Sequence, residues 1–247
     1  MVSARPGRRT PMPAPRSARG ARVLPSRAVN AAATANPDVA YDHSLVVDDL
    51  CCLRGERVLF DGLGFALEPG SAMQLEGPNG SGKTTLLRAV CGLAPIEAGH
   101  VYWDDRERDA RDEDFLAALT WIGDAPGVKR DLTPRENVAM QRALGTAPPR
   151  LADAAALARV GLAEHADTPL RRLSAGQLRR TALARLAAAP TPLWVLDEPL
   201  TALDAAGRAL VEQLIGEHLA RGGLCLISTH QPLELPGNAR IHLGELA

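Results

Sequence analysis

The stretch that decides the fold is Gly77-Pro78-Asn79-Gly80-Ser81-Gly82-Lys83-Thr84-Thr85. It has the spacing Gly-x-x-x-x-Gly-Lys-Thr, and it lies between a predicted strand, Ala72–Leu75, and a segment that favours a helix to about Cys91. Glycines let backbone N–H groups curl around phosphate oxygens, and the start of a helix adds partial positive charge there. We therefore predict a phosphate-binding loop, in which Lys83 reaches the β- and γ-phosphates and the Thr84 hydroxyl binds Mg²⁺.

Lysine is rare in this chain, because only Lys83 and Lys129 occur among 28 basic residues. Arginine serves everywhere else, so a lysine in this loop indicates a chemical requirement for a compact ammonium group. The alternative is a chance glycine-rich turn, which fits poorly with a strand on one side and a helix on the other.

A second acidic motif ends the apolar run Leu193–Leu196, which is followed by Asp197-Glu198-Pro199. Sheets of α/β proteins place their ligands at the carboxyl ends of the strands. We predict that Asp197 holds Mg²⁺ through water and that Glu198 is the general base that polarises an attacking water. Taken alone, the stretch is also compatible with a merely acidic strand end.

A third motif, Leu173-Ser174-Ala175-Gly176-Gln177, precedes the acidic strand. We expect Ser174 to cap a helix whose first backbone N–H groups, at Ala175 and Gly176, form another anion-binding nest. In isolation the pattern is only a helix start. Its place shortly before the acidic strand makes it diagnostic of a narrower class.

Together these motifs resemble the nucleotide-binding domains of ATP-binding cassette (ABC) proteins, over about residues 45–247. Thr201-Ala202-Leu203-Asp204 is similar to the family's D-loop, and His230 falls at its switch histidine. The resemblance implies an α/β P-loop NTPase fold with a RecA-like core, an antiparallel β-subdomain and a helical insert at about residues 126–189.

The resemblance also implies a head-to-tail homodimer that binds ATP and Mg²⁺. Each ATP would lie between Lys83 of one subunit and Ser174–Gln177 of the other, with Asp204 at the nucleotide site. Glu198 and His230 would be the catalytic residues, and His230 would contact the γ-phosphate. A surface or core histidine is the alternative interpretation of His230 alone.

Two positions depart from the family pattern. Asp124 stands where the family usually has a glutamine that touches Mg²⁺ and the transmembrane partner, and a carboxylate could still bind the metal through water. Arg54 stands where an aromatic residue often stacks on adenine. A guanidinium can also stack on a base, but a solvated arginine is equally compatible with the sequence.

Several stretches are similar to one subfamily, the ATP-binding subunit of the haem exporter in cytochrome c maturation, which commonly has histidine at the Asp124 position. They are Cys52–Phe60, Trp121–Gly123, Pro126–Lys129, Leu132-Thr133, Glu136-Asn137, Ser174–Leu186 and Thr229–Leu233. This resemblance implies an ATPase that powers haem export or the release of a haem-loaded chaperone. It would lie peripherally on the cytoplasmic face of the bacterial inner membrane, with integral membrane permease subunits as partners and the haem chaperone as an indirect one. The alternative function is the ATPase subunit of another ABC exporter or importer.

The charge is distributed unevenly along the chain. Residues 1–37 carry seven arginines and no acid, whereas the rest has 21 basic and 29 acidic residues, a net charge of −8. An acidic body argues against nucleic acid as a partner. We predict that residues 1–43 are a disordered Arg/Pro/Ala-rich extension before an ABC domain at 44–247. The extension is a spurious start, an unstructured bacterial segment or an organelle transit peptide, the last of which makes a mitochondrial location the alternative.

Other patterns complete the expected fold. Residues 134–189 favour helices, with Thr133 as the first N-cap and Pro134 in the first turn. No apolar run approaches the roughly 20 residues that cross a bilayer. The four cysteines form no CxxC pair and are expected to be buried and reduced. Further strands are predicted at Ser44–Leu53, Leu63–Leu67, His100–Trp103, Leu119–Ile122 and Leu224–Ser228, and a helix at Asp204–Ala220.

Two other classes of function compete with a transport ATPase. A cassette that acts on ribosomes or DNA usually has two cassettes or long coiled coils, whereas this chain has one cassette and no heptads. A regulator with a dead site is disfavoured because Lys83, Asp197, Glu198 and His230 are all present.

Overall fold

The structure is a computed structural model that describes residues 41–109, 112–144, 151–188, 191–235 and 237–244. The predicted disordered extension lies almost entirely outside the described residues and stays a prediction. Its last residues, 41–43, contact the body of the protein. The Tyr41 N–H donates to the Arg221 carbonyl at 3.0 Å, and the His43 ring stacks on Trp103 with centroids 4.9 Å apart.

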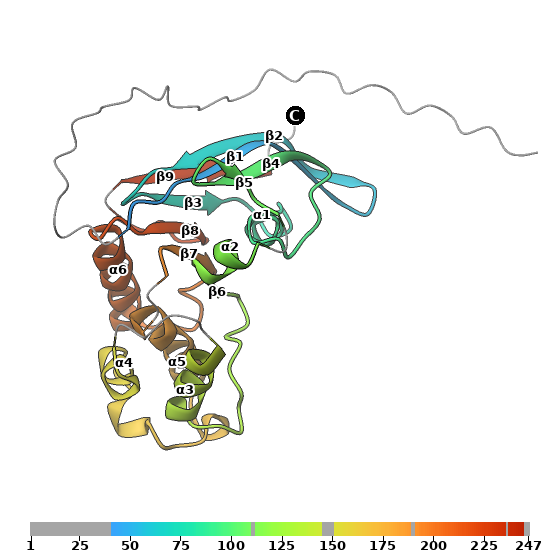
Figure 1. Ribbon diagram of the computed structural model, residues 1–247. Helices are drawn as coiled ribbons and strands as arrows, with labels where there is room; N and C mark the ends of the chain where they lie inside the picture. The colour runs from blue at the N-terminus through green and yellow to red at the C-terminus, as the bar shows by residue number, and fades with distance from the viewer. Residues whose placement is uncertain (1–40, 110–111, 145–150, 189–190, 236, 245–247) are drawn as a thin grey trace, which may run out of the picture.

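Two sheets lie one above the other in the upper arm of the molecule (Figure 1). The antiparallel sheet has the order β2-β1-β4-β5 and consists of β1 (Leu45–Arg54), β2 (Arg57–Leu67), β4 (Ala98–Trp103) and β5 (Arg106–Glu107). The parallel sheet has the order β6-β7-β8-β3-β9 and consists of β3 (Ala72–Glu76), β6 (Leu119–Ile122), β7 (Leu193–Asp197), β8 (Leu224–Ser228) and β9 (Asn238–His242). The predicted combination of a RecA-like core with an antiparallel subdomain is confirmed.

Helices pack on the sheets and build the second arm (Figure 1). The helices α1 (Lys83–Val90), α2 (Glu113–Ala117) and α6 (Ala205–Leu219) lie against the sheets. The lower arm holds α3 (Pro134–Leu144), α4 (Asp153–Arg159), α5 (Ala175–Ala188) and two short 3-10 turns, Ala163–His165 and Leu170–Arg172. Among the described residues, no helix has the length and apolar character needed to span a membrane.

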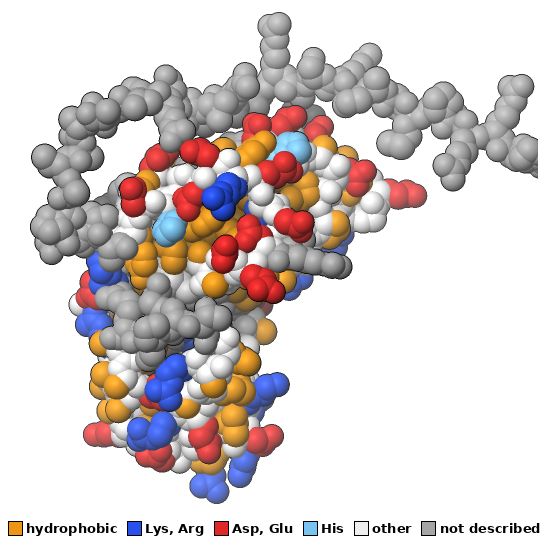
Figure 2. All heavy atoms as spheres, in the orientation of Figure 1, with side chains coloured by type: hydrophobic (Ala, Val, Ile, Leu, Met, Phe, Trp, Pro, Cys, Tyr) orange, Lys and Arg blue, Asp and Glu red, His pale blue; other side chains and the backbone are white. Residues whose placement is uncertain are grey.

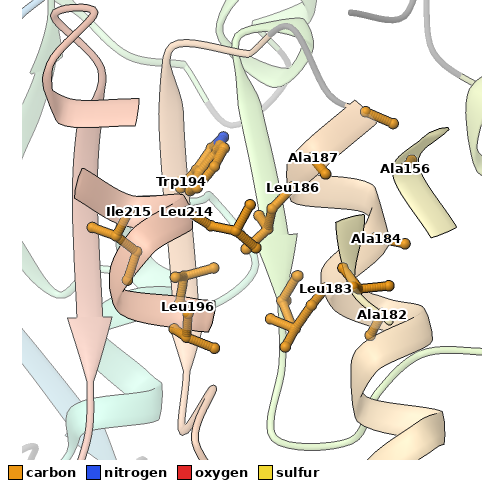
Figure 3. Close-up of a cluster of buried hydrophobic side chains, with 14 of the residues drawn as sticks. Ala156, Ala182, Leu183, Ala184, Leu186, Ala187, Trp194, Leu196, Leu214 and Ile215 are labelled. Carbon is orange, nitrogen blue, oxygen red and sulfur yellow. The ribbon is translucent and has the colours of Figure 1, made fainter. Parts of the chain in front are cut away.

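The core follows from the alternation of side chains along the central strands. All residues of β7 and β8 are buried, as expected for parallel strands covered on both faces. Leu193 and Val195 join the cluster around α1 and the antiparallel sheet, whereas Trp194 and Leu196 join the cluster around α5 and α6. Figure 3 shows the second cluster, in which Leu186 and Leu214 meet Trp194 and Leu196. The carboxyl end of β7 is thereby fixed between two packed layers.

The predicted elements differ from the structure mainly at the edges. The second strand begins at Arg57 rather than Leu63, because it continues as a hairpin partner of β1 through a largely exposed segment. Strand β9 was not predicted, and it pairs with β3 at the edge of the sheet, where no residue is fully buried. The capping prediction for α3 is confirmed: the helix begins at Pro134, and Thr133 Oγ1 accepts from the Glu136 N–H at 3.2 Å.

The surface of the upper arm is acidic on the face drawn in Figure 2, where Asp and Glu side chains are spread over the sheets. The four cysteines, Cys51, Cys52, Cys91 and Cys225, are buried and free, as predicted. Burial raises the pKa of Cys52 to about 11 and that of Cys91 to about 12, so both thiols are protonated at neutral pH.

Candidate nucleotide-binding site

The phosphate loop connects β3 to α1 and is shaped by its glycines. Gly77 has φ +134°, and a Cβ at that position would lie 2.1 Å from the Leu243 carbonyl oxygen. Gly82 has φ +105° and caps α1, so that Lys83 is the first residue of the helix. Side chains other than hydrogen are therefore excluded from both positions. The backbone of the loop can approach an anion at the helix N-terminus.

Lys83 is buried beneath the loop, with 7% of its surface exposed. Its Nζ donates to the Gly77 carbonyl at 2.6 Å and to the Pro78 carbonyl at 3.2 Å. These bonds hold the ammonium group inside the curve of the loop. An ammonium in this position is suited to contact phosphate oxygens as a point charge.

Thr84 and Asp197 bring two oxygen ligands together, although they are 113 positions apart in the sequence. The Thr84 hydroxyl donates to Asp197 Oδ2 at 2.9 Å, and the Ser228 hydroxyl donates to Asp197 Oδ1 at 2.5 Å. The carboxylate is 2% exposed, so its orientation is fixed by these two bonds. A hydroxyl beside a carboxylate next to a phosphate loop fits the oxygen chemistry of Mg²⁺.

Glu198 follows β7 directly and turns out of the strand. Its φ of +49° is unusual for a residue other than glycine. The backbone N–H donates to the Ser228 carbonyl at 3.0 Å, and Glu198 Oε1 lies 3.2 Å from His230 Nε2. The general-base candidate Glu198 and the predicted switch histidine His230 are therefore adjacent.

A cavity of about 400 Å³ joins these groups, and its volume is within the range of small-molecule sites. The predicted site residues that line it are Asn79, Gly80, Gly82, Lys83, Thr84, Thr85, Asp197, Glu198 and His230. Gly77, Pro78 and Ser81 do not line it. One chain thus supplies the phosphate loop, both acids and the histidine to a single cavity.

The residues Ser174–Gln177 do not line this cavity. They begin α5, where the Gln177 N–H donates to Ser174 Oγ at 3.2 Å and the Ser174 N–H donates to Gln177 Oε1 at 2.9 Å. This reciprocal capping box confirms that Ser174 caps a helix. Ser174 and Ala175 are exposed at the surface.

Asp204 also lies outside the cavity, because its side chain caps α6. Asp204 Oδ1 accepts from the Gly207 N–H at 2.8 Å and from Arg180 Nη2 at 3.0 Å. The Gly207 hydrogen bond, and then Arg180, lower the pKa of the carboxyl, which stays ionised at neutral pH. Its predicted contact with nucleotide stays a prediction.

The two departures from the family pattern both line the cavity. Asp124 is exposed, and Arg54 ends β1, where it pairs with Arg57 of β2. The cavity therefore extends from the acids to the β1–β2 hairpin.

Ser228 is the residue that sequence reasoning missed at this site. It ends β8 and pairs in register with Asp197, so its hydroxyl can reach both the Asp197 carboxylate and, at 3.1 Å, the Glu198 N–H. The sequence showed only a strand that ends in serine. The neighbouring position of β7 and β8 in the sheet was needed to connect the two.

Sequence comparison gives a consistent picture. The ABC transporter family profile matches residues 60–201. The cytochrome c biogenesis ATP-binding export protein CcmA of Methylococcus capsulatus is 46% identical over 203 residues, which cover 81% of this chain and 97% of that protein. The protein of the same name from Nitrosospira multiformis is 47% identical over 192 residues, which cover 77% of this chain and 93% of that protein.

Solved structures support the fold at lower identity. An ATP-binding cassette of an ABC transporter in its ADP conformation has a TM-score of 0.64 at 20% identity, covering 79% of this chain and 89% of that one. A bacterial Atm1-family ABC exporter with ATP bound has a TM-score of 0.67 at 23% identity, covering 78% of this chain and 35% of that one. The chain therefore belongs to the ATP-binding proteins of the ABC transporter family and, within it, to the cytochrome c biogenesis ATP-binding export proteins.

Proposed function

We propose that the chain is the ATPase subunit of an ABC export complex for cytochrome c biogenesis, in which hydrolysis of MgATP powers haem export or the release of a haem-loaded chaperone. The observation that carries the ATPase part is the meeting of Lys83, Asp197, Glu198 and His230 at one cavity. The cytochrome c part rests on the names of relatives that share nearly half of their residues with this chain.

Each group at the cavity has a defined task in phosphoryl transfer. The phosphate loop and Lys83 bind the β- and γ-phosphates. Thr84, and Asp197 through water, would hold Mg²⁺, which would neutralise charge on the phosphate oxygens. Glu198 accepts a proton from the attacking water, and the adjacent His230 can donate a hydrogen bond to the γ-phosphate.

The nucleotide site is completed by a second copy of the chain. The capped start of α5 is exposed and does not line its own cavity, so Ser174–Gln177 are available to a nucleotide held by another subunit. A head-to-tail arrangement places each nucleotide between the phosphate loop of one subunit and this helix start of the other. Asp204 would lie near the same interface.

The transport partners are integral membrane permease subunits, and the chain would sit beside them on the cytoplasmic face of the bacterial inner membrane. The haem chaperone would be an indirect partner. The alternative function, the ATPase subunit of another ABC exporter or importer, uses the same catalytic site and differs only in cargo.

Deletion of the gene in its own host tests the cargo. We expect haem-stained bands of c-type cytochromes to disappear and to return when the wild-type chain is supplied. The Glu198→Gln variant should not restore them, because it lacks the general base. Retention of all c-type cytochromes in the deletion strain would contradict the cytochrome c assignment and favour another cargo.

A further inference from the structure

Arg179 joins two loops that face the nucleotide cavity. It lies in α5, called the signature helix below because it begins in the signature motif Leu173–Gln177, and only 2% of its surface is exposed. Its Nη1 donates to the Gly123 carbonyl at 2.8 Å, and its Nη2 donates to the carbonyls of Asp124 at 2.8 Å and Glu198 at 3.0 Å. One guanidinium thus binds three peptide carbonyls from the ends of β6 and β7.

A buried guanidinium is costly unless its donors are used. Burial lowers the pKa of Arg179, and the carboxylates of Asp124, Asp197 and Glu198 act in the opposite direction. Asp124 Oδ1 lies 3.9 Å from Nη2, so one of the carboxylates that balance the positive charge of Arg179 is close to the guanidinium. The rigid fork of an arginine can reach several acceptors at once, which a lysine cannot do in the same way.

The contact with Glu198 acts on a residue whose backbone is already unusual. Its φ is +49°, and its N–H is held by Ser228 on the β8 side. Its carbonyl is held by Arg179 and by the Thr201 N–H at 3.2 Å. The peptide groups on both sides of the Glu198 side chain are therefore fixed, which sets the direction in which this side chain leaves the backbone.

We infer that Arg179 is a positioning residue, whose guanidinium holds Glu198 and the Asp124 loop in place relative to the signature helix, so that the Glu198 carboxylate is aimed at the attacking water. The inference rests on the proposed ATPase function. The same helix begins at Ala175, about one turn before Arg179, and its start is capped by Ser174 and Gln177. A displacement of this helix start is transmitted to Glu198 through a single side chain.

The test uses the full chain with the substitutions Arg179→Gln, Arg179→Lys and Glu198→Gln, and with Arg135→Gln as the control. Arg135 also donates through two nitrogens, to Asp167 at 2.8 and 3.1 Å, but it is exposed on α3 and away from the cavity. We would measure kcat for MgATP hydrolysis, the dissociation constant for ATP and the thermal midpoint of each variant. The double variant Arg179→Gln/Glu198→Gln completes a double-mutant cycle with the two single variants.

We expect Arg179→Gln to lower kcat roughly 10–100-fold with an unchanged dissociation constant, because a misplaced base slows chemistry and not binding. Arg179→Lys should recover part of the rate, and Arg135→Gln should keep the wild-type rate. Because Arg179 acts through Glu198, the double variant should have nearly the same kcat as Glu198→Gln alone. A general loss of structure would instead lower kcat below that of Glu198→Gln.

A wild-type kcat in folded Arg179→Gln would overturn the inference, and so would losses that add in the double variant. If Arg179→Gln does not fold, Arg179→Lys decides: a lower kcat at unchanged ATP affinity supports the inference, and a wild-type kcat overturns it. Failure of the proposed function gives a different result, since the wild-type chain itself would then hydrolyse no ATP.

Discussion

Lys83 is a basic residue of the nucleotide cavity, and we expect its charge to act on the phosphates. Its ammonium is buried and held by the carbonyls of Gly77 and Pro78 at the centre of the phosphate loop. We predict that Lys83→Ala weakens ATP binding by about 10–100-fold, which is the cost of losing charge-assisted hydrogen bonds to phosphate. Isothermal titration with ATP measures the change.

The chain supplies a matched control, because Lys129 is its only other lysine. Lys129 is exposed and does not line the cavity. Lys129→Ala should bind ATP as the wild type does. Equal affinity in both variants would refute the assignment of the phosphate loop.

Glu198 gives a prediction on chemistry that leaves binding intact. Glu198→Gln keeps the size of the side chain but cannot accept the proton of the attacking water. We expect hydrolysis to fall by about 10²–10⁴-fold, while ATP binding is retained because the phosphate loop is unchanged. Phosphate release measures hydrolysis and equilibrium titration measures ATP binding, and both are measured on the same preparation. Wild-type turnover would remove Glu198 from its assigned role.

At the residue scale, the sequence predicts those parts of the site that are carried by local motifs. Lys83, Thr84, Asp197 and Glu198 belong to short patterns with a physical reason for each spacing, and the structure brings all four to one cavity. Ser228 was not predictable in this way, because its contact with Asp197 depends on the pairing of β7 with β8. Side-chain contacts between strands far apart in the sequence need the topology first.

The elements of this fold carry two capping boxes of the same design. Ser174 and Gln177 cap α5, and Thr133 and Glu136 cap α3, each with reciprocal hydrogen bonds. Neither box lines the cavity, but the first begins α5 at the proposed second anion nest, whereas the second begins α3, for which no contact with nucleotide is proposed. Substitution of each cap in turn therefore tests the stability of a helix start separately from the proposed role of the α5 start at the nucleotide.

We predict that Ser174→Ala and Thr133→Ala each lower the free energy of unfolding by about 1 kcal/mol, the usual cost of a lost N-cap. Only Ser174→Ala should also reduce ATP hydrolysis, because its hydroxyl belongs to the proposed second anion nest. Denaturant unfolding and phosphate release measure the two effects. If both variants lost hydrolysis equally, a general loss of stability would be the cause and the nest would lose its support.

At the element scale, strongly patterned segments were predicted closely and edge elements were not. The predicted strands at 119–122 and 224–228 agree with the bounds of β6 and β8. Strand β9 escaped prediction because it is largely exposed at a sheet edge and shows no buried alternation. Helix α2 is five residues long and gives too little periodicity to detect.

At the scale of the whole molecule, the chain holds the parts of a nucleotide site at two separate places. The phosphate loop, the acids and His230 share one cavity, while the signature helix begins outside it on the other arm. If both parts act on one nucleotide, they come from different subunits. Each nucleotide site is then built from both subunits, and a dimer has two such sites. Substitutions on the two subunits can therefore fall on the same site or on different sites.

This arrangement predicts a complementation between two inactive chains. Glu198→Gln removes the proposed base, and Ser174→Arg is designed to block the proposed anion nest at the start of α5 with a bulky cation. In a head-to-tail heterodimer, both defects fall on one composite site, while the other site has an intact Glu198 from one subunit and an intact Ser174 from its partner. An equal mixture should therefore recover up to about a quarter of the wild-type rate, since half of the dimers are mixed and each has one intact site.

The same mixture discriminates against a site contained within one chain. If Ser174 acted on the nucleotide of its own subunit, each chain in the mixture would remain defective, and no activity would return at any ratio. The control is a mixture of Glu198→Gln with Lys83→Ala, whose defects lie on the same side of the interface. In that mixed dimer each composite site carries one defect, so no recovery is expected, and recovery only with Ser174→Arg would assign the signature nest to the partner's nucleotide.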